Sequence, residues 1–555
     1  MASRHTRKTV PPYSRVAIIG GSISGLAAAK QLAAHDPVVF EATQSVGGVW
    51  KHCAYRSTRL QTPRRNFRFS DHPWADPEGP VFPAHDEVVE YLESYADRFG
   101  LWRFIMLGAR VVGVNFLGKV GGPLQGEPMW EVGVATEQSD TIQYPSGLHG
   151  QWYKFEFVVM CMGKYGDVPR MPVFPPGKGT EAFKGKVMHS LDYCKLSEQE
   201  TLELVRGKKV VVVGYRKSAI DLALECAVAN KGERVEACTM LVRTPQWMLP
   251  SYSIWGLPFF LFYSTRFSQL LYDRPNQGLF RSFLCRLMTP LKAGVSKFIE
   301  LYLTWKLPLS KYGLKPPHPF VESYASCQMA ILPDGFFDMA DRGLIRFKRV
   351  SSGWCFSENG VVLEDGTEVE ADLVFLATGF EGLDIRQAPH RPAGTLPWPR
   401  RQQVRHDPAL PVRVRRYHML SSVHEHANKL FDTWHLLRFL NCSGTIHPLI
   451  PGMAFVGYVE SVSNLHTSEL RCRWLAGLLE GRFALPGAEA MAERVDGEAE
   501  AMRRTTRFFR RHCISTFSIH DSDGMCADLG VPAHRKGSWF AELFAPYNNQ
   551  DYKEE

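Results

Sequence analysis

The stretch that most constrains the fold is 14–29, which reads SRVAIIGGSISGLAAA. A β-branched run up to Ile19 predicts a buried strand, and the small residues from Ser24 onward predict a helix. The glycine-dense turn between them is typical of a dinucleotide site, because a helix N-terminus offers free N–H groups to a pyrophosphate. Glu41, which follows the short strand 38–40, stands where an acid accepts hydrogen bonds from an adenosine ribose. The pattern predicts FAD or NAD at Gly20, Gly21, Ser22, Ile23, Ser24, Gly25 and Glu41, and an ordinary α/β turn is the alternative.

Ser22 departs from the usual G-x-G-x-x-G spacing, since it occupies the place of the middle glycine. That glycine normally lets the backbone approach the phosphate closely. Serine is small and has a hydroxyl that can donate to a phosphate. We therefore expect binding to survive the change, with lower affinity.

A second strand–turn–helix unit begins at Gly207. The apolar strand 210–213 leads to Gly214, and the turn continues as Arg216, Lys217, Ser218 and Asp221 where G-x-G-x-S-x-x-D is usual. The next strand, 238–242, ends at Arg243 where an NAD site has an acid. A cation at that place favours a 2′-phosphate, and therefore NADP over NAD.

Length and composition set limits on the rest. A chain of 555 residues is too long for one hydrophobic core and should form two or more domains. The net charge of +8 is mostly local, since residues 384–443 hold ten Arg or Lys against four Asp or Glu. This argues against a nucleic-acid partner. The twelve scattered cysteines without a C-x-x-C pair predict reduced thiols, and with no apolar leader near Met1 we expect a cytoplasmic protein.

Several other segments carry weaker signals. Val49 and Trp50 follow a glycine pair, a turn that would lie near a flavin, although a core tryptophan is equally compatible. Residues 250–315 are aromatic and helical, which predicts a packed helical subdomain, a channel lid or a patch on a membrane surface. The strand 373–376 runs into Thr378 and Gly379, a usual crossing between nucleotide domains. Residues 384–443 are rich in Arg, Pro and His and predict a loosely ordered insertion without a zinc site, or else an incorrectly predicted stretch of coding sequence. A basic helix is expected around 503–511.

One further motif suggests a family. Residues 183–193, FKGKVMHSLDY, fit F-x-G-x-x-x-H-x-x-x-Y between the two glycine turns. With those turns, the sequence resembles the flavin-containing monooxygenases over nearly the whole chain except 384–443. The segments 164–169, 255–260, 463–470 and 511–517 resemble the plant branch of the family, in particular its pathogen-inducible member that N-hydroxylates pipecolic acid in systemic immunity.

The resemblance implies an α/β fold with two Rossmann-like domains, an FAD domain with an inserted NADPH domain. The expected boundaries are 1–205 for the first part of the FAD domain and 206–380 for the NADP-binding domain, with a helical insertion near 250–325. Residues 381–555 then return to the FAD domain and include the irregular insertion.

It also implies a mechanism. NADPH reduces FAD, the flavin reacts with O₂ to give a C4a-hydroperoxide, and an amine nitrogen or thioether sulfur takes the distal oxygen. Gln61, where the wider family has Asn, is then expected to hydrogen-bond at the flavin and NADP⁺, with Thr62 beside it. We expect a structural role for His189.

Alternatives remain open from the sequence. An auxin-forming enzyme acting on indole-3-pyruvate, or an S-oxygenase of the same family, would carry the same motifs. A disulfide reductase has the same layout, but only Cys53 follows the Gly-Gly turn. A relative that keeps the fold but has lost catalysis is an alternative of a different functional class, because Ser22 and Arg216 depart from the usual glycine motifs. Peripheral membrane contact and the oligomeric state are also left open.

Overall fold

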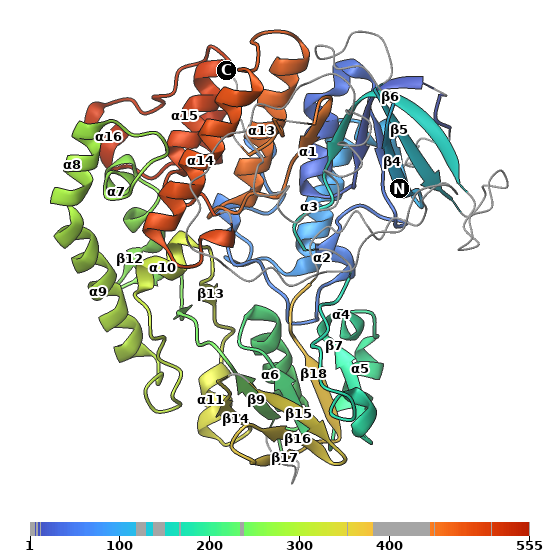
Figure 1. Ribbon diagram of the computed structural model, residues 1–555, viewed down its shortest axis with the longest axis vertical. Helices are drawn as coiled ribbons and strands as arrows, with labels where there is room; N and C mark the ends of the chain where they lie inside the picture. The colour runs from blue at the N-terminus through green and yellow to red at the C-terminus, as the bar shows by residue number, and fades with distance from the viewer. Residues whose placement is uncertain are drawn as a thin grey trace, which may run out of the picture.

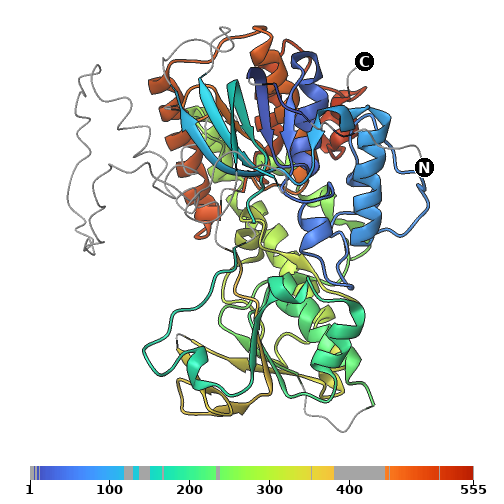
Figure 2. The ribbon, with the colours of Figure 1, turned by 90° about the vertical axis from the view of Figure 1, so that its right-hand side faces the viewer.

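The computed structural model describes residues 6, 9–11, 13–117, 129–136, 150–165, 168–232, 238–351, 353–380, 444–448, 450–511 and 513–553. These residues form a large lobe and a smaller lobe, each built on its own sheet (Figures 1 and 2). The predicted insertion at 384–443 lies outside the described residues.

The large lobe contains a seven-stranded sheet. Its strands follow the order β3-β2-β1-β6-β5-β4, and β19 also pairs with β6. The pairs joining β3, β2, β1, β6 and β19 are parallel, whereas β5 and β4 are antiparallel additions. The bounds are Tyr13–Ile19 (β1), Val38–Phe40 (β2), Ile105–Met106 (β3), Arg110–Phe116 (β4), Trp130–Ala135 (β5), Gln151–Met160 (β6) and Met453–Phe455 (β19).

Helices cover this sheet and close its core. The predicted strand and helix at 14–29 form β1 and α1 (Ile23–Gln31), and a longer helix, α3 (His85–Arg98), follows further along the chain. α13 (Asn464–Leu479) lies against α1 and is almost entirely buried. The first glycine turn is therefore packed between segments that are more than 400 residues apart in the sequence.

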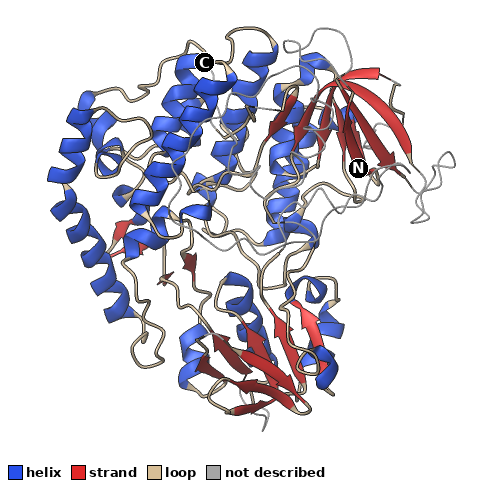
Figure 3. Cartoon of the chain, in the orientation of Figure 1, coloured by secondary structure: helices blue, strands red, loops and turns tan. Residues whose placement is uncertain are grey.

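The smaller lobe is a fully parallel five-stranded sheet in the order β14-β9-β8-β18-β7. The face of the sheet that includes Val212, Met240 and Phe375 packs on helices, whereas the face that includes Val211, Leu241 and Val374 packs on a small antiparallel sheet (Figure 3). The predicted strands at 210–213, 238–242 and 373–376 are confirmed as β8, β9 and β18, and residues 360–370 form the antiparallel pair β16–β17. The other bounds are β7 (Lys186–His189), α4 (Ser190–Tyr193), α5 (Glu198–Val205), α6 (Lys217–Ala229), α11 (Phe336–Asp341), β14 (Ile345–Arg349), β15 (Trp354–Ser357), β16 (Gly360–Leu363) and β17 (Glu368–Glu370).

β7 precedes residue 206 and nevertheless belongs to this second sheet, because it pairs with β18. By strand pairing the second unit thus begins about 20 residues before the predicted boundary. The four-residue strand between Gly185 and Ser190 has no length or periodicity that would mark it in the sequence.

Between β9 and β14 the chain leaves the small sheet and packs against the large lobe (Figure 1). This helical insertion contains the elements β10 (Met248–Leu249), β11 (Ser253–Ile254), β12 (Leu257–Pro258), α7 (Arg266–Leu270), α8 (Leu279–Leu287), α9 (Thr289–Lys306), α10 (Phe320–Ala325) and β13 (Ala330–Ile331). It is helical and aromatic as predicted. No described helix is long and apolar enough to cross a membrane.

The C-terminal segment returns to the large lobe as α14 (Ala488–Thr505), α15 (Ser518–Asp528) and α16 (Trp539–Phe544). The predicted basic helix at 503–511 is wrong in its extent, because α14 ends at Thr505 and only a short 3₁₀ turn, Phe509–Arg511, follows. Arg507 lies between them and pairs with Glu322 at 2.7 Å, which holds the chain away from the helix axis.

The prediction of reduced thiols is wrong for one pair. Cys327 and Cys513 form a disulfide, with Cα atoms 5.9 Å apart and 186 residues between them in sequence. It joins the end of the helical insertion to the C-terminal segment. A separation of that size leaves no local spacing pattern by which the pair could have been recognised.

Candidate functional site

The first glycine turn has the close packing that requires glycine. Gly20 has φ +108°, and a Cβ there would lie 2.7 Å from the carbonyl oxygen of Cys161. A Cβ on Gly25 would lie 1.8 Å from the carbonyl oxygen of Gly20, because α1 passes directly over the turn. These contacts are the close helix–strand approach that a dinucleotide turn needs.

Glu41 is fixed at the end of β2 and faces this turn. Its carboxylate accepts hydrogen bonds from the backbone N–H of Gly21 at 2.7 Å and of Thr43 at 2.9 Å. The predicted ribose acceptor is therefore held beside the turn. Ile23 and Ser24 begin α1 there, and the Ser24 hydroxyl lies 3.1 Å from that of Ser468 on α13.

Ser22 is the N-cap residue of α1 and has φ −107°, a value that any residue adopts. Its hydroxyl donates to the carbonyl oxygen of Gly47 at 2.9 Å, rather than remaining available to a phosphate as we expected. The substitution for glycine thus causes no backbone strain, and it ties the turn to the Gly47–Gly48 loop.

Val49 and Trp50 lie in the short helix α2 (Val49–His52) after that loop. Val49 is exposed and lines a large cavity. Trp50 is partly buried against the core of the large lobe, with its ring edge-on to Phe67 at 6.2 Å between centroids.

The second turn repeats the first in the smaller lobe. Gly214 has φ +137°, and a Cβ there would lie 2.8 Å from the carbonyl oxygen of Ala377. Arg216 is the N-cap of α6, extended at φ −118°. Lys217 pairs with Asp221 one helical turn later, and burial raises the pKa of the Asp221 carboxyl to about 6 despite that cation.

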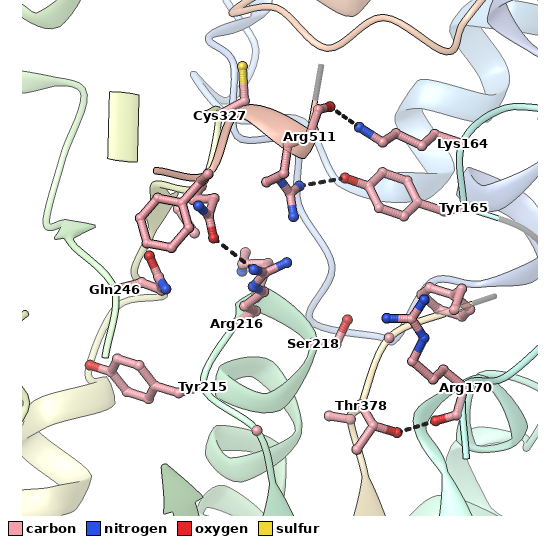
Figure 4. A pocket seen from close by; sticks show the side chains of 18 of the residues that line it. Lys164, Tyr165, Arg170, Tyr215, Arg216, Ser218, Gln246, Cys327, Thr378 and Arg511 are labelled. Carbon is pink, nitrogen blue, oxygen red and sulfur yellow. Dashed lines mark hydrogen bonds between the residues drawn. The ribbon is translucent and has the colours of Figure 1, made fainter. Parts of the chain in front are cut away.

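A cavity of about 1440 Å³ lies between the two lobes (Figure 4). It is lined from the smaller lobe by the second turn from Gly214 to Ser218 and by Arg243, Thr378 and Gly379. From the large lobe it is lined by Val49 and Gln61, among others. Val49 and Gln61 thus meet the predicted second site at one cleft, whereas the first turn and Glu41 are not part of the cavity wall.

Gln61 of the large lobe bonds to a segment that joins the two lobes. Its side-chain oxygen accepts a hydrogen bond at 3.0 Å from the backbone N–H of Ile331, in the segment that returns to the small sheet. Thr62 lines a second cavity, of about 400 Å³, together with Tyr252 and His466. The two neighbours therefore face different spaces.

The motif at 183–193 positions the crossing between the lobes. His189 is buried, and its Nδ1 accepts from the N–H of Leu191, so that Nε2–H donates to the carbonyl oxygen of Gly379 at 3.0 Å. Tyr193 donates to Glu225 of α6 at 2.8 Å. Burial lowers the pKa of His189, which keeps the ring neutral. These contacts agree with a structural role for His189.

Sequence reasoning missed a basic cluster on the opposite wall, formed by Lys164 and Arg511 of the large lobe. Both contact Glu460 at 3.1 Å, and Tyr165 donates to the same carboxylate at 2.6 Å. Arg216 extends from α6 toward this cluster and donates to Gln328 at 2.7 Å (Figure 4). The residues are far apart in sequence and have no local motif that could have identified them.

The cluster has more positive charge than its surroundings balance. Burial lowers the pKa of Lys164 and of Arg216, and the charge of Arg511 lowers both further. Seven Arg or Lys side chains line the cavity, whereas four carboxylates line it or pair with these cations, those of Glu460, Asp221, Glu498 and Asp521. Such a cleft is suited to anionic ligands, because a desolvated cation gains most from an opposite charge.

The residues present therefore fit two dinucleotides, one at each glycine turn. The profile of the Flavin-binding monooxygenase-like family matches residues 13–383, about two thirds of the chain. The chain is 50% identical to the probable flavin-containing monooxygenase 1 of Arabidopsis thaliana over all of its own length and 98% of that protein. The chain belongs to the flavin-containing monooxygenase family.

Other comparisons agree with this assignment. The putative flavin-containing monooxygenase 2 of Arabidopsis thaliana is 44% identical over 93% of this chain and 97% of its own. A crystal structure of cyclohexanone monooxygenase from Rhodococcus sp. Phi1 bound to NADP⁺ has the same fold, with a TM-score of 0.59 at 18% identity, covering 90% of this chain and 91% of that one.

This flavin-containing monooxygenase uses FAD and NADPH, which confirms the predicted cofactors and the predicted pair of Rossmann-like units. Family membership also sets aside the disulfide reductase alternative. Among the described residues, no group of His, Cys, Asp and Glu is arranged to hold a metal ion.

Proposed function

We propose that this monooxygenase N-hydroxylates a cyclic secondary amino acid, with pipecolic acid as the substrate, in plant systemic immunity. The observation that carries the proposal is the excess of cations in the cleft. NADPH accounts for only part of it, because Arg243 and the second turn lie on the small-lobe wall, whereas Lys164 and Arg511 belong to the large lobe. The carboxylate of an amino-acid substrate would pair with Lys164 and Arg511.

Each part of the cleft has a role in this proposal. Bound FAD, reduced by NADPH, activates O₂ for transfer to a nucleophile. Gln61, which would lie beside the flavin, accepts a hydrogen bond from Ile331 on a segment that joins the two lobes. Lys164 and Arg511 orient the carboxylate, so that the ring nitrogen rather than the acid is presented to the reacting centre. Glu460 keeps these cations in place when the substrate is absent.

The direct test is to incubate the holoenzyme with pipecolate, NADPH and air and to identify the product by mass spectrometry. We expect an added oxygen on nitrogen. Indole-3-pyruvate and a methylthioalkyl compound are offered in parallel, since they represent the auxin-forming and S-oxygenating alternatives. If one of these is oxygenated and pipecolate is not, the proposed substrate is wrong.

A variant tests the role of the cluster. Lys164→Met should lower kcat/KM for pipecolate at least tenfold, because a buried charge pair is lost. Piperidine, which has the same ring without the carboxylate, should react equally well with both proteins. Lys208→Met, on the surface of the smaller lobe, is the matched control. An equal loss for pipecolate and piperidine would contradict carboxylate recognition.

A further inference from the structure

The helical insertion presents a long apolar face to solvent. On α8 the exposed apolar side chains are Leu279, Phe280, Phe283 and Leu287, with Leu279 at 91% and Phe280 at 81% exposure. On α9 they are Leu291, Phe298, Leu301 and Trp305, spaced at intervals of seven, three and four residues. This spacing puts them on one side of the helix, while Ile299 and Leu303 on the other side are buried in the core.

The face continues beyond these two helices. Trp255 is half exposed and stacks on Trp305 at 4.9 Å between ring centroids. On the other side, α7 contacts α8 through a hydrogen bond from Arg281 to the carbonyl oxygen of Gln269, and α16 packs on α7 with Trp539 and Phe540 exposed. All these elements lie along one edge of the large lobe (Figure 1). We call this surface the α8–α9 face.

The charges on this face have one sign. Between residues 279 and 306 there are five Arg or Lys and one acid, Glu300. The Glu300 carboxylate is mostly buried: one oxygen accepts from the N–H of Phe320 and the hydroxyl of Ser296, each at 3.0 Å, and the other pairs with Lys297 at 3.3 Å, which leaves the segment with four more cations than acids. Arg286, Lys297 and Lys306 are exposed beside the apolar residues.

From this combination we infer that the α8–α9 face docks on the surface of a membrane that contains anionic lipid. An apolar face with flanking cations is the pattern of helices that lie in the membrane interface. Tryptophans at Trp255, Trp305 and Trp539 suit the headgroup region, where an apolar ring with a polar N–H is favoured.

Other occupants fit less well. A second copy of this chain would bring five cations against five, which opposes association. A partner helix would need a groove, and neither of the two cavities described above is lined by α8 or α9 residues. A broad face without a groove suits a flat, fluid surface.

The experiment is sedimentation of the full-length holoenzyme with vesicles. We expect binding to vesicles of phosphatidylcholine with about one third phosphatidylserine, little binding to phosphatidylcholine alone, and release in 0.5 M salt. Absence of binding to both, or equal binding to both, would overturn the inference. A dimer in sedimentation velocity that the apolar substitutions below dissociate would assign the face to self-association instead.

Two sets of variants locate the contact. Phe280→Ser with Phe283→Ser should reduce vesicle binding at least tenfold, whereas Val173→Ser, which removes an equally exposed apolar side chain elsewhere, should not. Arg286→Glu with Lys297→Glu should also reduce vesicle binding at least tenfold, because the double variant reverses two charges and keeps the apolar residues. Lys208→Glu is the matched control. Flavin content and NADPH oxidation report whether each variant is folded, and unchanged vesicle binding in both sets would overturn the proposed face.

Discussion

The two glycine turns have the same backbone and different surroundings. In each, a Cβ added to the first glycine would lie within 3 Å of the carbonyl oxygen of a residue just after a neighbouring strand, and the third residue is an extended N-cap that is not glycine. Around the first turn, Ser22 and Glu41 bond to residues of the same lobe. At the second turn, Arg216 extends into the cleft between the lobes and bonds to Gln328.

We propose that the first turn holds the flavin and the second holds the nicotinamide dinucleotide, and the difference then corresponds to what each turn must do. A flavin stays bound through many turnovers, and the first turn is enclosed by its own lobe. The nicotinamide dinucleotide has to enter and leave, and the second turn opens on the cleft. Glycine at the third position is not needed for backbone geometry in either place, since both residues have ordinary negative φ values.

The largest effect is expected at Gly25. In Gly25→Ala the new Cβ would overlap the carbonyl oxygen of Gly20, so that α1 could not pack on the turn. We expect colourless protein that does not recover a flavin spectrum when FAD is added. The control is Gly524→Ala, whose Cβ meets nothing within 4 Å, and a yellow, active Gly25→Ala protein would contradict the geometry.

Gly214→Ala should separate the two turns. The residue has positive φ and its Cβ would press on the carbonyl oxygen of Ala377, which distorts the second turn alone. We expect normal flavin content and a KM for NADPH raised at least tenfold. Loss of flavin from this variant would mean that the two turns are not independent.

Arg243 tests the choice of nucleotide. Arg243→Gln should lower the ratio of kcat/KM for NADPH to that for NADH about tenfold, because the cation facing the 2′-phosphate is lost. Arg346→Gln, an exposed arginine on β14 of the same sheet, should leave the ratio unchanged. A ratio insensitive to both substitutions would place the 2′-phosphate elsewhere.

A smaller effect is expected at Arg216. Arg216→Met keeps the length of the side chain and removes its buried charge, and we expect the KM for NADPH to rise by about three- to tenfold. Gln328→Leu removes the partner of Arg216 and should change KM less. Stopped-flow reduction of the flavin by NADPH measures both, and an unaltered rate and KM in Arg216→Met would show that its role is confined to Gln328.

The smallest effect is expected at Ser22. Ser22→Ala loses the hydrogen bond to Gly47, which is worth about 1 kcal/mol, so FAD should bind at most about fivefold more weakly. Ser22→Gly should behave similarly, since φ does not require glycine. Titration of the apoprotein with FAD measures the effect, and a change above tenfold in Ser22→Ala would mean that the hydroxyl contacts the cofactor after all.

Much of this architecture could be predicted because its signals are local. The strands at 38–40, 210–213, 238–242 and 373–376 are short apolar runs next to glycine turns, and they occur where the pattern placed them. Glu41 and Asp221 could be named because each stands at a fixed distance from its turn.

What could not be predicted depends on contacts between distant segments. Lys164 and Arg511 meet at Glu460 although nearly 350 residues separate them, and Cys327 meets Cys513 across 186 residues. β7 is recognisable as part of the second sheet only from its pairing with β18. The Ser22 side chain bonds to Gly47, and the Arg216 side chain bonds to Gln328. The sequence around the two turns does not indicate either partner.

The path of the chain between the lobes has a mechanical consequence. The chain enters the small lobe after β6, leaves it after β9 for the helical insertion, returns through β13 and leaves again after β18. Four separate covalent connectors therefore span the cleft, and Gln61 is hydrogen-bonded to one of them. Four connectors resist sliding and twisting of one lobe against the other more than they resist bending. We therefore expect the cleft to open by a hinge rotation, with the hinge axis near Gln61.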